Sequence, residues 1–296
     1  MSRKNVCWSV LLVLSCWASL VAPASAQHFK QVKGTLAQVA AGRNEIFGVD
    51  SNFAVWRFNA TKKSFGEIEG ASLVKVAVGG GSVSQLDDVW GVDINGHVFR
   101  FNYSTKTFVE QGGILTEIVV GIGNQDNCHP YEVWGVNSAD QIFRYNYCTK
   151  QFDQEGGSGG RLTQVATGGG DVWGLNSAGQ IFHFNFGSQS FGQVGGTLVE
   201  ISVGVNDVWG INGNNQVFRY DPTSGGFNLL GGVVGQISAG GDGVWAINPT
   251  NEIFRFDPSS AEWVQIGGAL SSIAVGSGAG IFGVNPSDQV FTFVRP

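Results

Sequence analysis

The chain has 296 residues, with 17 basic and 23 acidic side chains and a formal net charge of −6. Its 45 glycines and its 12% of aromatic residues favour many short strands joined by tight turns. The negative charge argues against a protein that binds nucleic acid through its phosphates and against simple electrostatic docking on anionic lipid, because both need a basic surface.

The first segment has the features of a secretory signal peptide. Arg3 and Lys4 are followed by a mostly apolar run over residues 6–21 and by an Ala-Ser-Ala cleavage site. We therefore expect a signal peptide over residues 1–26, with cleavage at its end. A lipoprotein anchored through Cys16 is the alternative, but Leu-Ser-Cys matches the lipidation pattern only in part and the apolar run continues beyond it.

Removal of this segment leaves one domain, residues 27–296. Its net charge is −8, because residues 1–26 contain two of the 17 basic residues and none of the 23 acidic ones. We expect the domain to be secreted to the extracellular space or, in a bacterial host, to the periplasm or the cell surface. No other apolar run is long enough to span a membrane.

One phrase recurs along this domain: a strand with an aromatic residue before glycine (once before alanine), a tight turn, and a second strand. The recurring aromatic residue is Phe47, Trp90, Trp134, Trp173, Trp209, Trp245 and Phe282. The residue ten places later is Arg57, Arg100, Arg144, His183, Arg219, Arg255 and Thr292. An alternating strand precedes each phrase and a strand with an aromatic residue follows it, and four strands in about 36 residues are typical of a β-propeller blade.

The two ends of the domain are incomplete repeats. The last repeat begins at Leu270 and has three strands, whereas residues 29–33 resemble a fourth strand with no repeat before them. We therefore predict an all-β fold, a seven-bladed β-propeller of four-stranded antiparallel blades. In this fold residues 29–33 join the last blade as its outer strand and close the ring.

Two insertions, residues 80–87 and 123–132, lie between the first and second strands of the second and third repeats. Cys128 lies in the second insertion, and the hairpin register around the following turn places Cys148 near it. An exported chain favours a disulfide between this pair. The bridge would close a loop of about 20 residues and contribute about 3 kcal/mol in the chain-entropy model.

Asn59 and Asn102 each begin an Asn-x-Ser/Thr sequon in the turn before the outer strand. Turns are exposed, so both positions are suitable for glycosylation. Their use depends on the host, because a bacterium would normally leave such sequons unmodified.

Catalysis has little support in the sequence. The histidines of the domain, which show no metal-ligand spacing, are His28, His97, His129 and His183. No nucleophile elbow, phosphate loop or calcium loop is present, so we expect no catalytic residue, metal or cofactor. Acids recur before the second strand of a repeat, where we interpret them as turn formers; they are Asp88, Glu132, Asp171 and Asp207.

The recurring tryptophans have two interpretations. They can fill the gaps between blades, where large aromatic side chains are needed. Alternatively, their edges can line pockets at blade junctions, where sugar CH faces stack on indole while Arg and Asn bond the hydroxyls. The candidate ligand-binding residues are Trp90, Arg100, Trp134, Asn137, Arg144, Trp173, Asn176, Trp209, Asn212, Arg219, Trp245, Asn248 and Arg255, with Asp50, Asp93 and Asn285 at the same turn position as the Asn residues.

The phrase at residues 171–182 resembles the tectonin repeat, and residues 132–144 and 207–219 match it equally well. The resemblance covers nearly the whole domain. It implies a β-propeller lectin, similar to tachylectin-1-like and fish-egg lectins and to fungal tectonins, whose partners are glycans such as lipopolysaccharide, N-acetylglucosamine or methylated sugars. The sequence departs from that pattern in its seven repeats, where such lectins often have six, and the repeats with His183, Thr292, Phe47 and Phe282 are expected to lack a site.

Three functions follow from these observations. The first is a secreted multivalent lectin that recognises cell-surface glycans, in microbial recognition or agglutination. The second is a non-catalytic protein-interaction propeller that uses the loops 80–87 and 123–132, with every tryptophan in the core. The third is an enzyme, which a fold alone never excludes but which no motif supports. The sequence does not indicate an oligomeric state.

Overall fold

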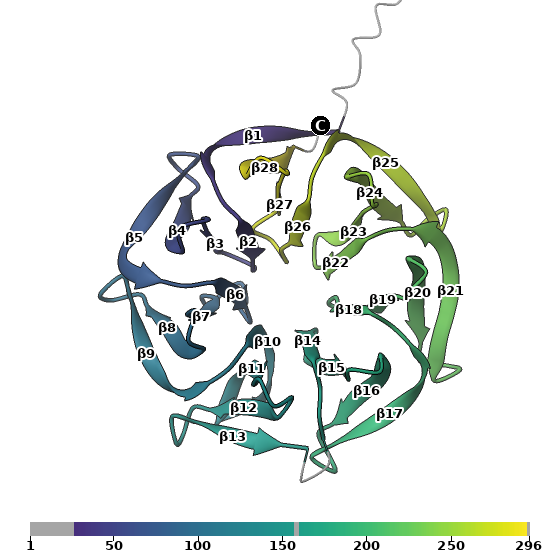
Figure 1. Cartoon of the computed structure of the whole chain (residues 1–296), viewed down its shortest axis with the longest axis horizontal. Coiled ribbons are helices and arrows are strands. Elements are labelled where there is room, and N and C mark those ends of the chain that lie inside the picture. Colours follow the sequence, from purple (N-terminus) through teal and green to yellow (C-terminus); the bar gives the residue numbers. More distant parts are fainter. Residues whose placement is uncertain (1–26, 157–159, 295–296) are drawn as a thin grey trace, which may run out of the picture.

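The structure is a computed structural model, and it describes residues 27–156 and 160–294. The expected signal peptide, residues 1–26, lies outside the described residues. Four-stranded antiparallel blades are arranged around a ring (Figure 1). The predicted all-β fold with four-stranded antiparallel blades is therefore confirmed. In the described part of the chain, no helix has the length and apolarity that a membrane crossing needs.

The strands occupy four equivalent positions in successive blades. The innermost strands are β2 (Gln38–Ala41), β6 (Lys75–Gly79), β10 (Glu117–Asp126), β14 (Gln164–Gly168), β18 (Glu200–Val203), β22 (Gln236–Gly240) and β26 (Ser272–Val275). The second strands are β3 (Ile46–Val49), β7 (Asp88–Val92), β11 (His129–Val136), β15 (Asp171–Leu175), β19 (Val208–Ile211), β23 (Gly243–Ile247) and β27 (Ile281–Val284). The third strands are β4 (Ala54–Asn59), β8 (His97–Asn102), β12 (Ile142–Asn146), β16 (Gln180–Asn185), β20 (Gln216–Asp221), β24 (Glu252–Asp257) and β28 (Gln289–Val294). The outer strands are β1 (His28–Thr35), β5 (Ser64–Ser72), β9 (Thr107–Ile114), β13 (Gln151–Glu155), β17 (Ser190–Thr197), β21 (Gly226–Val233) and β25 (Glu262–Ala269).

The outer strand beside β28 comes from the other end of the chain. Phe29 of β1 pairs antiparallel with Phe293 of β28, and single parallel bridges also join β1 to β25 and to β5. The sheet that contains β1 therefore links three blades: β2–β5, β22–β25, and β26–β28 with β1. The segments 28–35 and 289–294 lie side by side in the ring (Figure 1).

The tight turn between the second and third strands is determined by its residue types. Asp140 and Asn215 stand at the turn position that requires a left-handed backbone, with φ of 60° and 62°. Asn and Asp tolerate this conformation better than other residues with a side chain, and glycine fills the same place at Gly96 and Gly179. This local chemistry fixes the hairpin register on which the blade face depends.

Neighbouring blades are joined by side chains at the start of the innermost strands. Gln164 Oε1 accepts a hydrogen bond from Ile201 N of the next blade at 3.2 Å, and Glu200 Oε1 accepts one from Ile237 N at 3.0 Å. The other bonds of this kind are Gln38 with Val76 and Gln236 with Ile273. Glu200 is the one carboxylate among these acceptors, and burial raises its pKa to about 7.

Glycine at the end of the innermost strand allows the blades to approach closely around the centre. A Cβ atom on Gly79 would lie 2.2 Å from the carbonyl oxygen of Val120 in the next blade, and one on Gly276 would lie 2.4 Å from Gly42 O. Real Cβ atoms do not approach backbone this closely. The backbones of neighbouring innermost strands are therefore in direct contact, including those of the last and first blades.

The two insertions differ in structure. Residues 80–87 form a loop whose Asp87 is buried and accepts hydrogen bonds from the N–H groups of Arg43, Asn44 and Glu45 in the preceding blade. The segment 123–132, predicted as a loop, instead largely extends β10 and β11 into a longer hairpin, because its backbone continues the antiparallel ladder at Ile122–Tyr131. The predicted disulfide between Cys128 and Cys148 is confirmed.

Candidate functional site

The recurring aromatic residue and the residue ten places later are direct cross-strand neighbours. Trp90 pairs with Arg100, and Trp134 pairs with Arg144. The equivalent pairs are Phe47 with Arg57, Trp173 with His183, Trp209 with Arg219, Trp245 with Arg255, and Phe282 with Thr292. The predicted register of the second and third strands is therefore confirmed along the chain.

The five tryptophans of this series are completely buried, with 0% of their surface exposed. Each indole meets an aromatic ring from the third strand of the following blade, edge to face; for Trp90 and Tyr145 the ring centroids are 4.6 Å apart. The equivalent contacts are Trp134 with Phe184, Trp173 with Tyr220, Trp209 with Phe256, and Trp245 with Phe293. The indoles therefore fill the junctions between blades, and their faces contact protein rather than solvent.

The acids that precede the second strand belong to the same clusters. Glu132 accepts hydrogen bonds from Trp134 Nε1 at 2.7 Å and from Arg144 Nε and Nη2 at 2.8 and 2.6 Å. Asp88 accepts equivalent bonds from Trp90 Nε1 at 2.7 Å and from Arg100 Nε at 2.8 Å. The interpretation of these acids as turn formers is wrong for Asp88, Glu132 and Asp171, because they lie in the strand ladder and pair with the side chain across from them. Asp207 instead precedes β19, and its backbone carbonyl accepts a hydrogen bond from Gly204 N in the turn.

The first three cations are covered by an aromatic ring from the following blade. Arg100 lies 4.9 Å from the ring centroid of Tyr147, and Arg144 lies 5.3 Å from that of Phe186. Tyr103 covers Arg57 in the same way. The pair of Arg144 and Glu132 is nearly inaccessible, with side-chain exposures of 4% and 0%, so it is part of the core.

The next two junctions are more open, because prolines, Pro222 and Pro258, occupy the sequence position of the covering ring. His183 Nε2 lies 2.6 Å from Asp171 Oδ1, and both side chains are 37% exposed. Arg219 is 45% exposed and lies 3.6 Å from Asp207.

The cationic side chains of these two open pairs contact the tryptophan across from them in different ways. The His183 ring stacks on Trp173 with its centroid 4.1 Å away and an interplanar angle of 8°, and Arg219 lies over Trp209 at 5.3 Å. Burial opposes the ionisation of Asp171, but hydrogen bonds from His183 and Trp173 outweigh burial and lower its pKa. Each pair therefore presents a polar edge to solvent on a rigid indole base.

The Asn residues proposed to act with the arginines lie at the other end of the hairpin. Asn137 Oδ1 accepts from the N–H groups of Ala139 and Gln141, and its Nδ2 donates to the Gln141 side chain. Asn176, Asn212, Asn248 and Asn285 form the same turn, as do Asp50 and Asp93. Asn137 lies five positions after Glu132, the partner of Arg144, and five steps along a strand amount to about 16 Å. The structure therefore does not bring the Arg and Asn groups into one site.

The two sequon asparagines occupy exposed turns after the third strands. Asn59 Oδ1 accepts from Lys62 N, and Asn102 Oδ1 accepts from Ser104 N. Both side chains are exposed. Their recurrence at this place is explained by the turn that they form.

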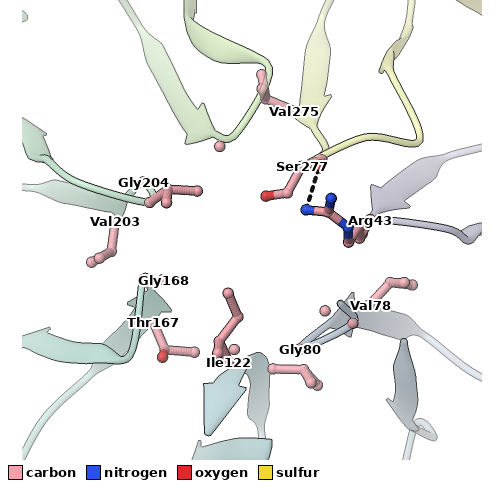
Figure 2. A pocket seen from close by; sticks show the side chains of 18 of the residues that line it. Arg43, Val78, Gly80, Ile122, Thr167, Gly168, Val203, Gly204, Val275 and Ser277 are labelled. Atoms are coloured by element: carbon pink, nitrogen blue, oxygen red, sulfur yellow. Dashed lines mark hydrogen bonds between the residues drawn. The ribbon is translucent and has the colours of Figure 1, made fainter. Parts of the chain in front are cut away.

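A further pocket lies at one end of the central hole, where the glycine-rich ends of the innermost strands converge (Figure 2). Arg43 is its one charged residue within the described chain, and its Nη1 donates to Ser277 O at 3.4 Å. The hydroxyls of Thr167 and Ser277 already bond to backbone groups. The pocket therefore has one charged side chain, whereas each open blade junction has a charge pair exposed to solvent.

Comparisons with known proteins agree with this architecture. The family model of the Tectonin domain matches residues 18–159 and 161–295. No curated protein sequence matches the chain.

Solved structures show the same fold at low sequence identity. Human WBSCR16 is 12% identical, with a TM-score of 0.66, and the match covers 90% of this chain and 88% of that one. YCF48 bound to D1 peptide is 12% identical, with a TM-score of 0.67 and coverages of 93% and 98%. Prp20p from Saccharomyces cerevisiae is 10% identical, with a TM-score of 0.62 and coverages of 86% and 81%. Because the Tectonin model matches almost the entire chain, including every blade, this protein belongs to the tectonin-domain family.

Proposed function

We propose that this protein is a secreted, multivalent lectin: a closed, seven-bladed ring that binds cell-surface glycans through its open blade junctions. The observation that supports this proposal most is the pair of exposed polar clusters, Asp171–His183 and Asp207–Arg219, at successive junctions. Its glycans would include lipopolysaccharide, N-acetylglucosamine or methylated sugars, and its role would be recognition or agglutination of microbes. Membership of the tectonin-domain family supports this role.

The chemistry of these clusters suits sugar hydroxyls. A carboxylate accepts hydrogen bonds from hydroxyl groups, whereas a guanidinium or an imidazole N–H donates them. Paired donors and acceptors at fixed spacing recognise neighbouring hydroxyls of one sugar ring. The buried indoles of Trp173 and Trp209 hold the His183 ring and the Arg219 guanidinium in place, so that little side-chain freedom is lost on binding.

Repetition around the ring compensates for the weakness of each site. Several sites on one rigid body engage a repetitive glycan surface together, with a gain in avidity on the order of 10²–10⁴. Binding should therefore be much tighter to multivalent glycans than to free sugars.

A glycan-array screen with lipopolysaccharides and methylated sugars tests the proposal. Arg219→Gln and His183→Ala should each weaken binding, while thermal unfolding stays within a few degrees of the native protein. Arg161→Gln is the matched control, because Arg161 is exposed and donates to Ala139 O outside these pairs. Absence of selective binding by folded protein would reject the lectin.

A second candidate is a protein-interaction ring. Val83 and Leu86 in the loop 80–87 are 88% and 51% exposed, and Tyr131 from the extended hairpin donates to Leu86 O at 3.0 Å. The two insertions are therefore in contact, beside two exposed apolar side chains. YCF48 bound to D1 peptide and Prp20p, described with its binding to Gsp1p and histones, are propellers with protein partners. Loss of a partner in Val83→Ser/Leu86→Ser, but not in Arg219→Gln, would favour this function.

A further inference from the structure

The junction at Trp245 lacks the carboxylate that other junctions use to bind the indole N–H. In three other blades the indole Nε1 donates to an acid two residues earlier in the chain. These bonds are Trp90 to Asp88 at 2.7 Å, Trp134 to Glu132 at 2.7 Å, and Trp173 to Asp171 at 2.8 Å. Two residues before Trp245 the chain has Gly243 instead.

The indole of Trp245 is nevertheless in the same position. Its Nε1 is buried and has no hydrogen-bond partner among the described residues. A Cβ atom built on Gly243 would lie 3.8 Å from this nitrogen, so an acid at position 243 would reach it as Asp171 reaches Trp173 Nε1. A buried N–H without an acceptor is unfavourable, and such groups require an explanation.

The Trp245 junction also contains the arginine that lies across from the indole in other junctions. Arg255 lies directly across from Trp245 in the strand register, as Arg144 does from Trp134. Within residues 27–156 and 160–294, no ion pair involves Arg255. The neighbouring acid, Asp242, accepts a hydrogen bond from Gly280 N in the next blade at 3.2 Å, and it does not bond to Trp245 Nε1.

The adjacent blade shows what complete loss of the cluster looks like. There the acid, the indole and the cation are all replaced, by Gly280, Phe282 and Thr292. No unmatched donor remains in that set. At the Trp245 junction the indole and the cation are both present, and the acid two residues before the indole is absent. Trp209 Nε1 also lacks a hydrogen-bond partner among the described residues, but there the acid, Asp207, is present.

We propose that a ligand supplies this acceptor: the carboxylate of an acidic sugar, of the uronic acid class, binds beside Gly243 between Trp245 Nε1 and the Arg255 guanidinium. Gly243 is exposed, and the equivalent acid Asp171 reaches Trp173 Nε1 while 37% exposed, so a ligand can approach from solvent. A carboxylate matches both donors, as Glu132 does in its own cluster. This inference rests on the proposed lectin function and assigns one junction to acidic glycans.

Titration of the ¹⁵N-labelled protein, followed through its indole N–H resonances, tests the site directly. Glucuronate should shift the Trp245 resonance, identified by its loss in Trp245→Phe, whereas glucose at equal concentration should not. Arg255→Gln should weaken glucuronate at least tenfold. Arg161→Gln makes the same charge change at an exposed position outside the junctions and should alter the affinity less than twofold.

Gly243→Asp provides an independent readout, because it restores an internal carboxylate. The variant should shift the Trp245 resonance without ligand and should no longer bind glucuronate. Gly243 has φ of 107°, so aspartate is strained there; if this variant does not fold, Arg255→Gln still decides the question.

The results separate the two proposals. Glycan binding on the array with no glucuronate response at Trp245 overturns this inference and leaves the lectin intact. An equal response to acetate and glucuronate, with no glycan bound anywhere, overturns both the sugar specificity and the lectin. A response that survives Arg255→Gln overturns the assigned binding residues.

Discussion

Replacing Arg144 with alanine should destabilise the protein strongly, although the same change at Arg219 should have little effect. Arg144 donates two hydrogen bonds to Glu132, at 2.8 and 2.6 Å, and the two side chains are only 4% and 0% exposed. Its removal leaves a buried carboxylate whose remaining side-chain donor is Trp134 Nε1. Arg219 makes a 3.6 Å ion pair with Asp207, lies over Trp209 at 5.3 Å and is 45% exposed.

The different burial of these two ion pairs determines how much stability each substitution removes. Loss of one partner from a buried ion pair costs about 3–5 kcal/mol, because the other charge stays desolvated. Loss of an exposed pair costs about 0–1 kcal/mol. Arg144 also contacts the rings of Trp134 and Phe186, at 5.4 and 5.3 Å, and these cation–π contacts add roughly 0.5–2 kcal/mol to the loss.

Urea denaturation monitored by tryptophan fluorescence measures both changes. Arg144→Ala should lower the midpoint strongly, with an unchanged slope, whereas Arg219→Ala should shift it slightly. The double variant Glu132→Gln/Arg144→Met should recover most of the loss, because no buried charge is left unpaired. Equal destabilisation in the two single variants, or no recovery in the double variant, would refute this reasoning.

Three further predictions concern other parts of the ring. Glu200→Gln keeps the acceptor for the next blade but removes a carboxylate whose pKa is raised to about 7. As the pH rises from 4.5 to 8, the free energy of unfolding of the native protein, measured by urea denaturation, should therefore fall by up to about 3 kcal/mol relative to that of the variant. At lower pH the two free energies should converge. Cys128→Ser/Cys148→Ser opens a loop with a sequence separation of 20 and should lower the free energy of unfolding by about 3 kcal/mol. Gly79→Ala forces a Cβ atom to 2.2 Å from the carbonyl oxygen of the next blade and should lower the melting temperature by several degrees, because overpacking costs about 1–3 kcal/mol.

Each of these predictions has its own control. A stability difference between Glu200→Gln and the native protein that does not change with pH would contradict the assignment of the raised pKa. A thiol reductant should reproduce the effect of the cysteine variant in the native protein and leave the variant unchanged. Gly66→Ala is the control for Gly79→Ala, because no atom lies within 4 Å of the added Cβ at Gly66; equal effects would contradict the close-contact argument.

The blades could be predicted well from the sequence, because the interactions that form each blade join residues that are close together in the chain. The tight turns, the alternation of each strand and the position of Trp134 opposite Arg144 all depend on residues close together in the chain. The disulfide followed from the same register. Each of these features can be worked out within one repeat.

The candidate site was predicted less well, because it depends on contacts between repeats. The ring that covers Arg144 is Phe186 of the following blade, and Pro222 at the corresponding position leaves His183 open. The role of Glu132 was also missed, although a signal existed: an acid precedes the cation by twelve residues in most repeats, and the repeat that ends in Thr292 has lost both.

The bonds between innermost strands have a consequence for evolution. The side chain of Gln164 accepts from Ile201 N, and the side chain of Gln236 accepts from Ile273 N, each 37 residues further along the chain. The units of Glu200 and Gln236 therefore each contain an acceptor for the following unit and a donor for the preceding one. Tandem duplication of a unit would copy both halves of this junction at once, so the number of units can change by recombination without new compensating mutations.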